Sequence, residues 1–224
     1  MSIQFGVYDF FAYAVPGGLY LLLFAYILAS FTEVRFDFLA LRDLSLVQTL
    51  AVVAFAYVVG LVVERVAVLW YRIFEPEHLA ESVLDGFKKR HPGIEFKFQG
   101  SHWPILIAYL RKEGLDTTTE IHRFNAIHIM LKNASFGFML LSVVEMILFI
   151  RNTVEWAHLI ASVGAIVSSV LAARQAVRFK RWFFSANFEA VIARGLRQDD
   201  LVTKRDHFAG LGEEEIVPSR GETA

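Results

Sequence analysis

The hydrophobic positions of the chain fall into four long runs separated by polar segments. The runs cover residues 10–31, 46–70, 124–150 and 156–179. A helix of about 20 mostly apolar residues is long enough to cross the hydrocarbon core of a bilayer. The pattern therefore predicts an all-α membrane protein with four transmembrane helices.

The third run grows out of a polar helix. Thr117 is followed three residues later by Glu120, the spacing of a capping box at a helix start. No proline or glycine follows until Gly137, and residues 134–150 are apolar or small except for Glu145. We expect one rigid rod that joins a water-exposed segment to the lipid, along which a cytosolic signal can reach the bilayer.

The basic residues give the four runs a direction. The first and third connections hold only Arg35, Arg42 and Arg151. The second connection and the segment after the fourth run carry many more: Arg72, Lys88, Lys89, Arg90, Lys97, Arg111, Lys112 and Arg123, then Arg178, Lys180, Arg181, Arg194, Arg197, Lys204, Arg205 and Arg220. By the positive-inside rule, both termini and the long second connection are predicted to be cytoplasmic.

This topology divides the chain into four parts. They are residues 1–70 with the first two transmembrane helices, 71–123 as a small cytoplasmic helical insertion, 124–179 with the last two transmembrane helices, and 180–224 as a cytoplasmic amphipathic helix and flexible tail. The insertion is expected to hold two helices, and residues 94–98 between them alternate as a short strand would. It is too small for much stability alone. We expect it to pack on the membrane surface, on the C-terminal segment or on another protein.

A helix-breaking sequence stands near the cytoplasmic end of the first run. Pro16 is followed directly by Gly17 and Gly18. Proline removes one backbone hydrogen bond of the helix, and neighbouring glycines weaken it further. Two interpretations remain open, a hinge or gate and a kink used only for packing.

Polar residues within the runs are candidates for gating. Charged groups in a span cost about 2.5–3.5 kcal/mol on insertion scales and usually face protein or water. The candidates are Glu64, Lys132, Ser142, Glu145 and His158. Glu145 is predicted to lie inside the bilayer with His158 within reach across the last hairpin, and Glu64 can pair with Lys132 at the inner face. A pore lining and plain interhelical hydrogen bonds are both open.

The fourth run carries small residues at every fourth position. One row is Ala157, Ala161, Ala165, Ser169 and Ala173, and the second is Gly164, Ser168, Ala172 and Ala176. Such rows let helices approach closely in lipid. We expect one row to pack inside the protomer and the other against a second copy, although contacts within one protomer can use both.

The helix of the fourth run is predicted to continue past the membrane. Arg178, Lys180, Arg181 and Trp182 suit contact with an anionic inner leaflet. Packing of this segment on the second connection is the equal alternative.

Few patterns of catalytic chemistry occur. The chain has no cysteine, no HExxH and no Walker or Rossmann glycine motif, so no metal and no cofactor are expected. Arg123 and His128 match the Arg-x4-His spacing of some small ribonucleases, but Phe124 stands where those domains usually place a polar residue. The chain is therefore predicted not to be an enzyme and not to bind nucleic acid directly.

The N-terminal sequence Tyr8-Asp9-Phe10-Phe11-Ala12-Tyr13-Ala14-Val15-Pro16-Gly17, opening a four-span layout with a cytoplasmic middle loop, resembles small membrane proteins of bacterial anti-phage defence systems. The resemblance implies a membrane effector or sensor that works with a soluble partner. The leading hypothesis is a multi-pass protein of the bacterial inner membrane that self-associates and perturbs or senses the membrane when a cytosolic partner engages it. The alternatives are a scaffold that recruits a soluble enzyme and a small transporter.

Overall fold

The computed structural model describes residues 7–32, 45–92, 99–112, 117–152 and 155–193, and these residues form helices and the turns between them. Four of the helices are long and apolar enough to cross a membrane. They are α1 (Val7–Phe31), α2 (Leu46–Tyr71), α5 (Thr117–Arg151) and α6 (Trp156–Ala193). The four runs of the sequence are thus confirmed as helices, and they indicate a multi-pass membrane protein.

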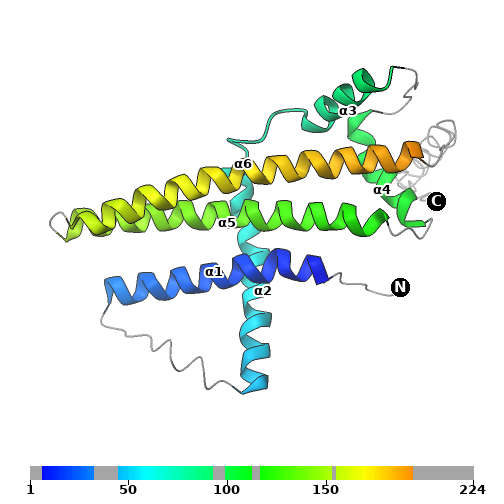
Figure 1. The fold of residues 1–224 in the computed structure, drawn as a ribbon. Coiled ribbons are helices and arrows are strands. Elements are labelled where there is room, and N and C mark those ends of the chain that lie inside the picture. Colours follow the sequence, from blue (N-terminus) through cyan, green and yellow to red (C-terminus); the bar gives the residue numbers. More distant parts are fainter. Residues whose placement is uncertain (1–6, 33–44, 93–98, 113–116, 153–154, 194–224) are drawn as a thin grey trace, which may run out of the picture.

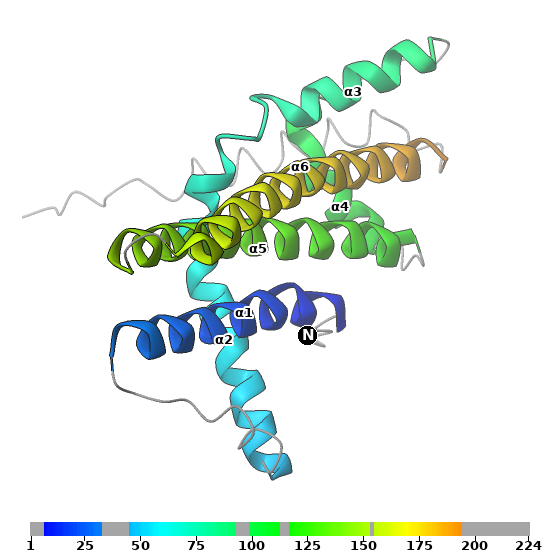
Figure 2. The same ribbon diagram turned by 60° about the vertical axis from the view of Figure 1, so that its left-hand side comes forward.

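Three of the apolar helices run alongside one another. α5 and α6 form a long antiparallel hairpin, and α1 lies beside α5 (Figure 1). α5 is continuous over its 35 residues, as the capping box and the absence of early glycine or proline predicted. The start of α1, the start of α5 and the end of α6 lie at one end of this bundle, whereas the α5–α6 turn lies at the other (Figures 1 and 2).

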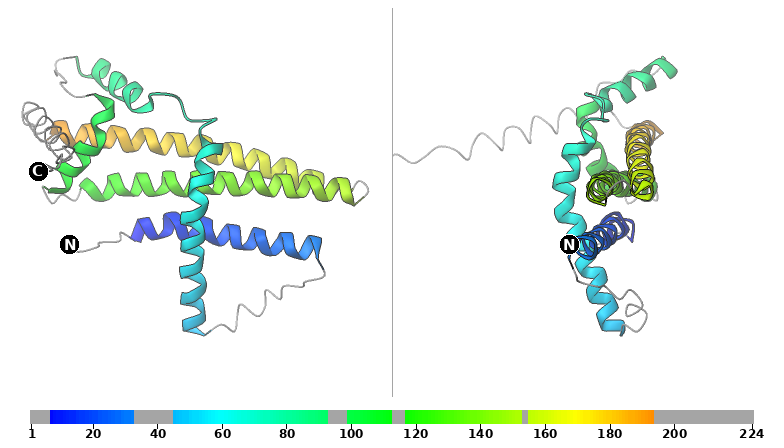
Figure 3. Two further views of the ribbon diagram at one scale, coloured as in Figure 1. Left: turned by 180° about the vertical axis from the view of Figure 1, so that it is seen from behind. Right: turned by 90° about the vertical axis from the view of Figure 1, so that its left-hand side faces the viewer.

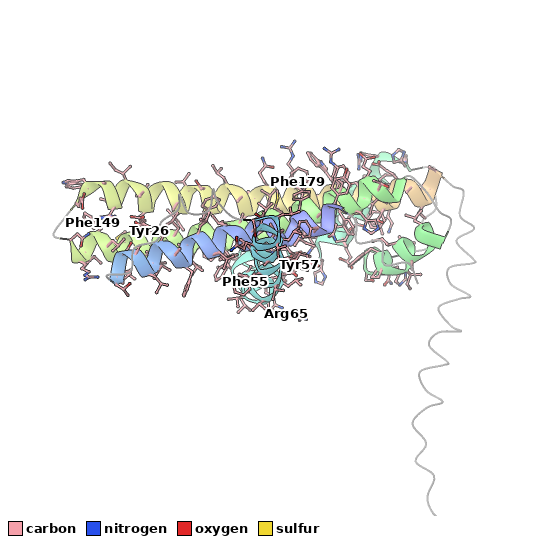
Figure 4. The ribbon with its side chains drawn as sticks, turned by 90° about the horizontal axis from the view of Figure 1, so that it is seen from below. Tyr26, Phe55, Tyr57, Arg65, Phe149 and Phe179 are labelled. Carbon is pink, nitrogen blue, oxygen red and sulfur yellow. The ribbon has the colours of Figure 1, made fainter. Side chains whose placement is uncertain are left out.

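α2 has a different direction from the other three long helices. It runs across them (Figure 3), and the view along its axis shows α1, α5 and α6 from the side (Figure 4). If α1, α5 and α6 stand upright in a bilayer, α2 in this arrangement lies along the membrane plane. Most of its first ten residues are exposed, and Leu46 and Val47 are 75% and 76% exposed. We call residues 46–55 the α2 arm.

α1 and α2 cross at very short range. A Cβ atom added to Gly17 would lie 1.7 Å from the carbonyl oxygen of Ala56, and one added to Gly60 would lie 2.1 Å from that of Tyr13. Only glycine allows this approach, because any side chain would meet backbone. α1 nevertheless continues through the buried Pro16 to Phe31. In the structure the Pro16-Gly17 sequence therefore packs against α2, while Gly18 has no atom near its missing side chain.

The helices of the second connection pack on the C-terminal half of α6. α3 (Leu79–Arg90) and α4 (Trp103–Lys112), with the 3-10 turn η2 (Gly100–His102), lie at the same end of the bundle as the start of α5. A hydrophobic cluster joins these elements, and its largest buried members include Tyr71, Leu84, Leu106, Leu110, Ile121 and Phe188. We call it the end cluster. Of the three packing sites expected for the insertion, the C-terminal segment is the one observed.

Two predictions fall outside the described residues. The short strand was expected at residues 94–98, and the flexible tail lies within 194–224. α6 itself is described to Ala193, well past the predicted limit of the fourth run.

Candidate functional site: polar groups between the helices

A carboxylate near the α5–α6 turn binds two other helices. Glu145 of α5 is 6% exposed. The Tyr26 hydroxyl of α1 donates to its Oε1 atom at 2.7 Å, and Nδ1 of His158 of α6 lies 2.8 Å from Oε2. Figure 4 shows Tyr26 in this end of the bundle, close to Phe149 in the view. Glu145 therefore links α1, α5 and α6, and we call these three residues the turn-end cluster.

The remaining ring nitrogen of His158 faces the water-exposed turn. Its Nε2 atom lies 3.4 Å from Nδ2 of Asn152 and 3.6 Å from a carboxylate oxygen of Glu155. His158 is partly exposed, whereas Glu145 is buried. The imidazole thus stands between the outside of the bundle and the carboxylate.

α2 is fastened to α5 by two polar contacts. The Lys132 ammonium donates to Oε1 of Glu64 at 2.9 Å, with the lysine buried and the glutamate partly exposed. Six residues further along α2 and three further along α5, the indole Nε1 of Trp70 donates to the Ser135 hydroxyl at 3.0 Å. The pairing of Glu64 with Lys132 satisfies both charges, as a pair in an apolar setting requires. We call these four residues the α2 clasp.

Serines connect α5 with α6 along their length. The Ser169 hydroxyl donates to the Ser135 carbonyl at 2.7 Å, and the Ser162 hydroxyl donates to the Ser142 carbonyl at 2.9 Å. Hydroxyls that bind a backbone carbonyl of the next helix are typical of close packing in lipid. Ser142, expected among the gating candidates, therefore takes part in an α5–α6 contact in this structure.

The small residues of α6 divide between an inner and an outer face. Three members of the first row, Ala165, Ser169 and Ala173, are buried with Ser162 and Ala176 in the bundle. An outer face is formed by the exposed or half-buried members of both rows: Ala157, Ala161, Gly164, Ser168 and Ala172. A Cβ atom added to Gly164 would meet nothing within 4 Å. We call this second set the outer small face.

The basic residues at the end of the bundle have different partners. Lys180 forms a close ion pair with Glu75, which turns its side chain toward the second connection. Arg178 places its guanidinium carbon 4.7 Å from the ring centre of Trp182. Arg178, Arg181 and Trp182 are exposed and so remain available to a membrane surface, whereas Lys180 is used within the protein.

Arg123 and His128 lie in different surroundings. Arg123 is exposed, whereas His128 is buried with its Nδ1 atom 3.1 Å from the Ala176 carbonyl and its ring against Tyr71. His128 thus contributes to the contact between α2, α5 and α6. In the part of the chain that the structure describes, no group of three or more histidine or acidic side chains is arranged to hold a metal ion.

Some buried or half-buried polar groups were not singled out from the sequence. Tyr26 completes the turn-end cluster, and the Tyr20 hydroxyl donates to the Asn133 carbonyl at 2.6 Å. The side-chain amide of Asn133 and the hydroxyl of Tyr71 are buried without a hydrogen-bond partner among the described residues. Asn133 stands next to the gating candidate Lys132 in the sequence, and that position was the signal that could have indicated it.

Comparison with known proteins gives no match: no protein-family model, no curated protein and no solved structure corresponds to this chain.

Proposed function

We propose that this chain is a non-enzymatic, self-associating protein of the bacterial inner membrane, an effector or sensor that responds to a cytosolic partner. The observation that carries the proposal is the continuity of α5. Near its start, Ile121 is buried in the end cluster with α3, α4 and α6. Further along the same helix, Glu145 holds Tyr26 and His158. The 24 residues between them correspond to about 36 Å of helix.

A partner that moves the second connection acts directly on this rod. α3 and α4 pack on α6, and the end cluster includes residues of α5 and α6 as well. Packed helices shift as units because their interiors are dense. A displacement at the end cluster therefore alters the α5–α6 and α1–α5 contacts on which the turn-end cluster depends. The consequence we propose is a change in membrane permeability or a signal across the bilayer.

The direction of the protein follows from its charges. The second connection and the segment after residue 173 hold most of the basic residues, and the described parts of both lie at one end of the bundle. The positive-inside rule assigns this end to the cytoplasm. The resemblance of the N-terminal motif to anti-phage membrane proteins supports the bacterial inner membrane and a defence role.

Self-association is supported by two surfaces that the described residues leave exposed. The α2 arm is apolar and exposed, and the outer small face of α6 admits a close helix. In Figure 3 the α2 arm extends beyond α1, and α6 lies on the other side of α5 from α1. Contacts between these two different surfaces would be head-to-tail, and such contacts close into rings or continue as rows.

The function is tested by following membrane potential with a voltage-sensitive dye in bacteria challenged with phage. Glu145→Gln removes the charge that Tyr26 and His158 bind, and Met146→Leu is the matched control on the neighbouring exposed position. We expect the first variant to change the depolarisation and the second to leave it as in the unmodified protein. Unchanged depolarisation in Glu145→Gln contradicts the conducting form of the proposal.

A second candidate, a scaffold that recruits a soluble protein, is favoured by one cavity. It measures about 460 Å³ and opens at the cytoplasmic end between the end of α2, the start of α3 and Trp103. His78 at the start of α3 has a left-handed backbone with φ of 59°, which is uncommon for a residue other than glycine. Glu77→Lys places an exposed opposite charge at this cavity. Loss of a pulled-down partner, with liposomes that stay sealed, would favour the scaffold over the conducting effector.

A further inference from the structure

An open pocket lies between α5 and α6 where the two helices leave the apolar part of the bundle. Its volume is about 360 Å³, and it is lined by Glu120, Phe124, Trp182, Ser185, Ala186 and Glu189. We call it the headgroup pocket. It is separate from the turn-end cluster, since it involves the first turns of α5 and the last third of α6.

The pocket combines aromatic rings with acidic groups. The rings of Phe124 and Trp182 have centroids 5.8 Å apart, and Phe179 packs edge-on against Trp182. Glu120 and Glu189 are exposed, and neither belongs to an ion pair within the described ranges. Aromatic faces next to carboxylates attract a cation, because the ring quadrupole and the negative charge act together. The pocket is therefore suited to an ammonium group.

A cationic group adjoins the pocket on the side of the membrane. Arg178 lies one turn before Trp182 on α6 and stacks on its ring at 4.7 Å. Arginine binds phosphate oxygens with two parallel N–H donors. A ligand that fits both parts has a phosphate close to Arg178 and an ammonium close to Glu120 and Glu189.

The order of these groups along α6 matches the depth of a lipid headgroup. The 26 residues from Trp156 to Trp182 correspond to about 39 Å of helix, close to the full thickness of a bilayer including its headgroups, about 40–45 Å. Arg178 is nearer to the apolar core than Trp182, while Glu189 lies about 10 Å further toward the cytoplasm. Phosphate on the inner side and ammonium on the outer side is the arrangement of a zwitterionic lipid.

We propose that the headgroup pocket binds the phosphoethanolamine group of an inner-leaflet lipid. The proposal rests on the membrane embedding and direction given under the proposed function. A primary ammonium offers three N–H donors, which two carboxylates and the Ser185 hydroxyl can accept. Phosphatidylglycerol has no cation, so Glu120 and Glu189 disfavour it at this position.

The test uses the full-length protein in mixed micelles that contain equal amounts of phosphatidylethanolamine and phosphatidylglycerol, with bound lipid counted by native mass spectrometry. We expect the unmodified protein to retain phosphatidylethanolamine in excess. Glu120→Gln combined with Glu189→Gln should lower the ratio of the two bound lipids about tenfold, a change of about 1.4 kcal/mol. The matched control is Asp85→Asn, which removes an exposed acid of α3 and should leave the ratio unchanged.

Two further experiments distinguish failure of the lipid proposal from failure of the proposed function. Soluble phosphoethanolamine is added in competition, and displacement of the lipid by equimolar soluble compound overturns a lipid as the ligand. Cell fractionation tests the embedding itself: protein released without detergent overturns the proposed function and this inference together. Protein held in the membrane with the same lipid ratio in the double variant overturns only the inference.

Discussion

Tyr26 and His158 bind opposite oxygens of one carboxylate, although they lie on helices at the two ends of the chain. The Tyr26 hydroxyl reaches Oε1 of Glu145 and the His158 ring reaches Oε2, at 2.7 and 2.8 Å. Removal of either partner leaves the buried carboxylate under-satisfied, which costs more than the hydrogen bond itself contributes. One side chain of α5 therefore holds a group from each of α1 and α6 at this end of the bundle.

The first prediction concerns this contact. Tyr26→Phe removes the hydroxyl without changing the ring, and a hydrogen bond to a charged group contributes about 1.5–3 kcal/mol. We expect a lower midpoint of thermal unfolding in detergent. Tyr8→Phe, at an exposed tyrosine of the same helix, is the control and should leave the midpoint unchanged. Equal midpoints for both variants would show that the Tyr26 contact carries no stability.

The second prediction uses two adjacent glycines. Gly17→Ala puts a methyl group into the Ala56 carbonyl, whereas Gly18→Ala puts one into open space. Overpacking of a tight contact costs about 1–3 kcal/mol, whereas alanine at a free helical position is favoured over glycine by about 1 kcal/mol. The midpoint of thermal unfolding in detergent should therefore fall for Gly17→Ala and should stay level or rise for Gly18→Ala. The same change at both positions would contradict the α1–α2 crossing.

The direction of α2 gives the third prediction. The chain has no cysteine, so single cysteines can carry a fluorophore without a background. Leu50 and Leu69 are exposed residues of α2, separated by 19 residues or about 28 Å. Labels at Leu50→Cys and Leu69→Cys should be quenched alike by spin-labelled lipids of one depth, since a crosswise helix keeps both at a similar level.

An upright helix provides the comparison for that experiment. Labels at Val15→Cys and Phe31→Cys on α1, both exposed, should differ strongly in the lipid depth that quenches them best. If the α2 pair differed as much as the α1 pair, α2 would stand upright in the bilayer.

The fourth prediction concerns the contact between copies. A chain with both Leu50→Cys in the α2 arm and Gly164→Cys in the outer small face should form a ladder of cross-linked dimers, trimers and larger species in membranes. A head-to-tail contact produces such a ladder, because each copy offers both halves of it. Neither single variant should give more than a dimer.

A displaced cysteine tests whether that ladder is specific. Leu50→Cys combined with Leu22→Cys keeps two exposed apolar positions but moves the second one to α1. A ladder from this pair as strong as from the first would mean random collision. A strong dimer from Leu50→Cys alone would indicate an arm-to-arm contact in place of the head-to-tail one.

The sequence predicted local features well because each depends on neighbours along the chain. The continuity of α5 agrees with the absence of proline and early glycine in its sequence, and His158 lies only 13 residues from Glu145 across one turn. Tyr26 lies 119 residues away, and no periodicity relates it to Glu145. Such distant partners depend on how the helices pack, which a single sequence does not state.

The crosswise position of α2 could not be predicted from hydropathy. The length of an apolar run indicates that a helix favours lipid over water, but it does not indicate how the helix is oriented in the bilayer. Residues 46–70 therefore resembled the other three runs. The glycine pair that sets the crossing is spread over two helices, Gly17 and Gly60, and only the first stood out beside a proline. Lys180 likewise grouped with its basic neighbours in sequence, whereas its partner Glu75 is 105 residues earlier.

The α2 clasp can form only after most of the chain has been synthesised. Glu64 and Trp70 leave the ribosome 68 and 65 residues before Lys132 and Ser135, the partners that hold them. Until those residues are made, α2 can contact α1 through the Gly17–Gly60 crossing, but Lys132, the cation that binds its Glu64, is not yet present. In the nascent chain α2 must therefore occupy a provisional position. It reaches its final position only after α5 has been synthesised and inserted.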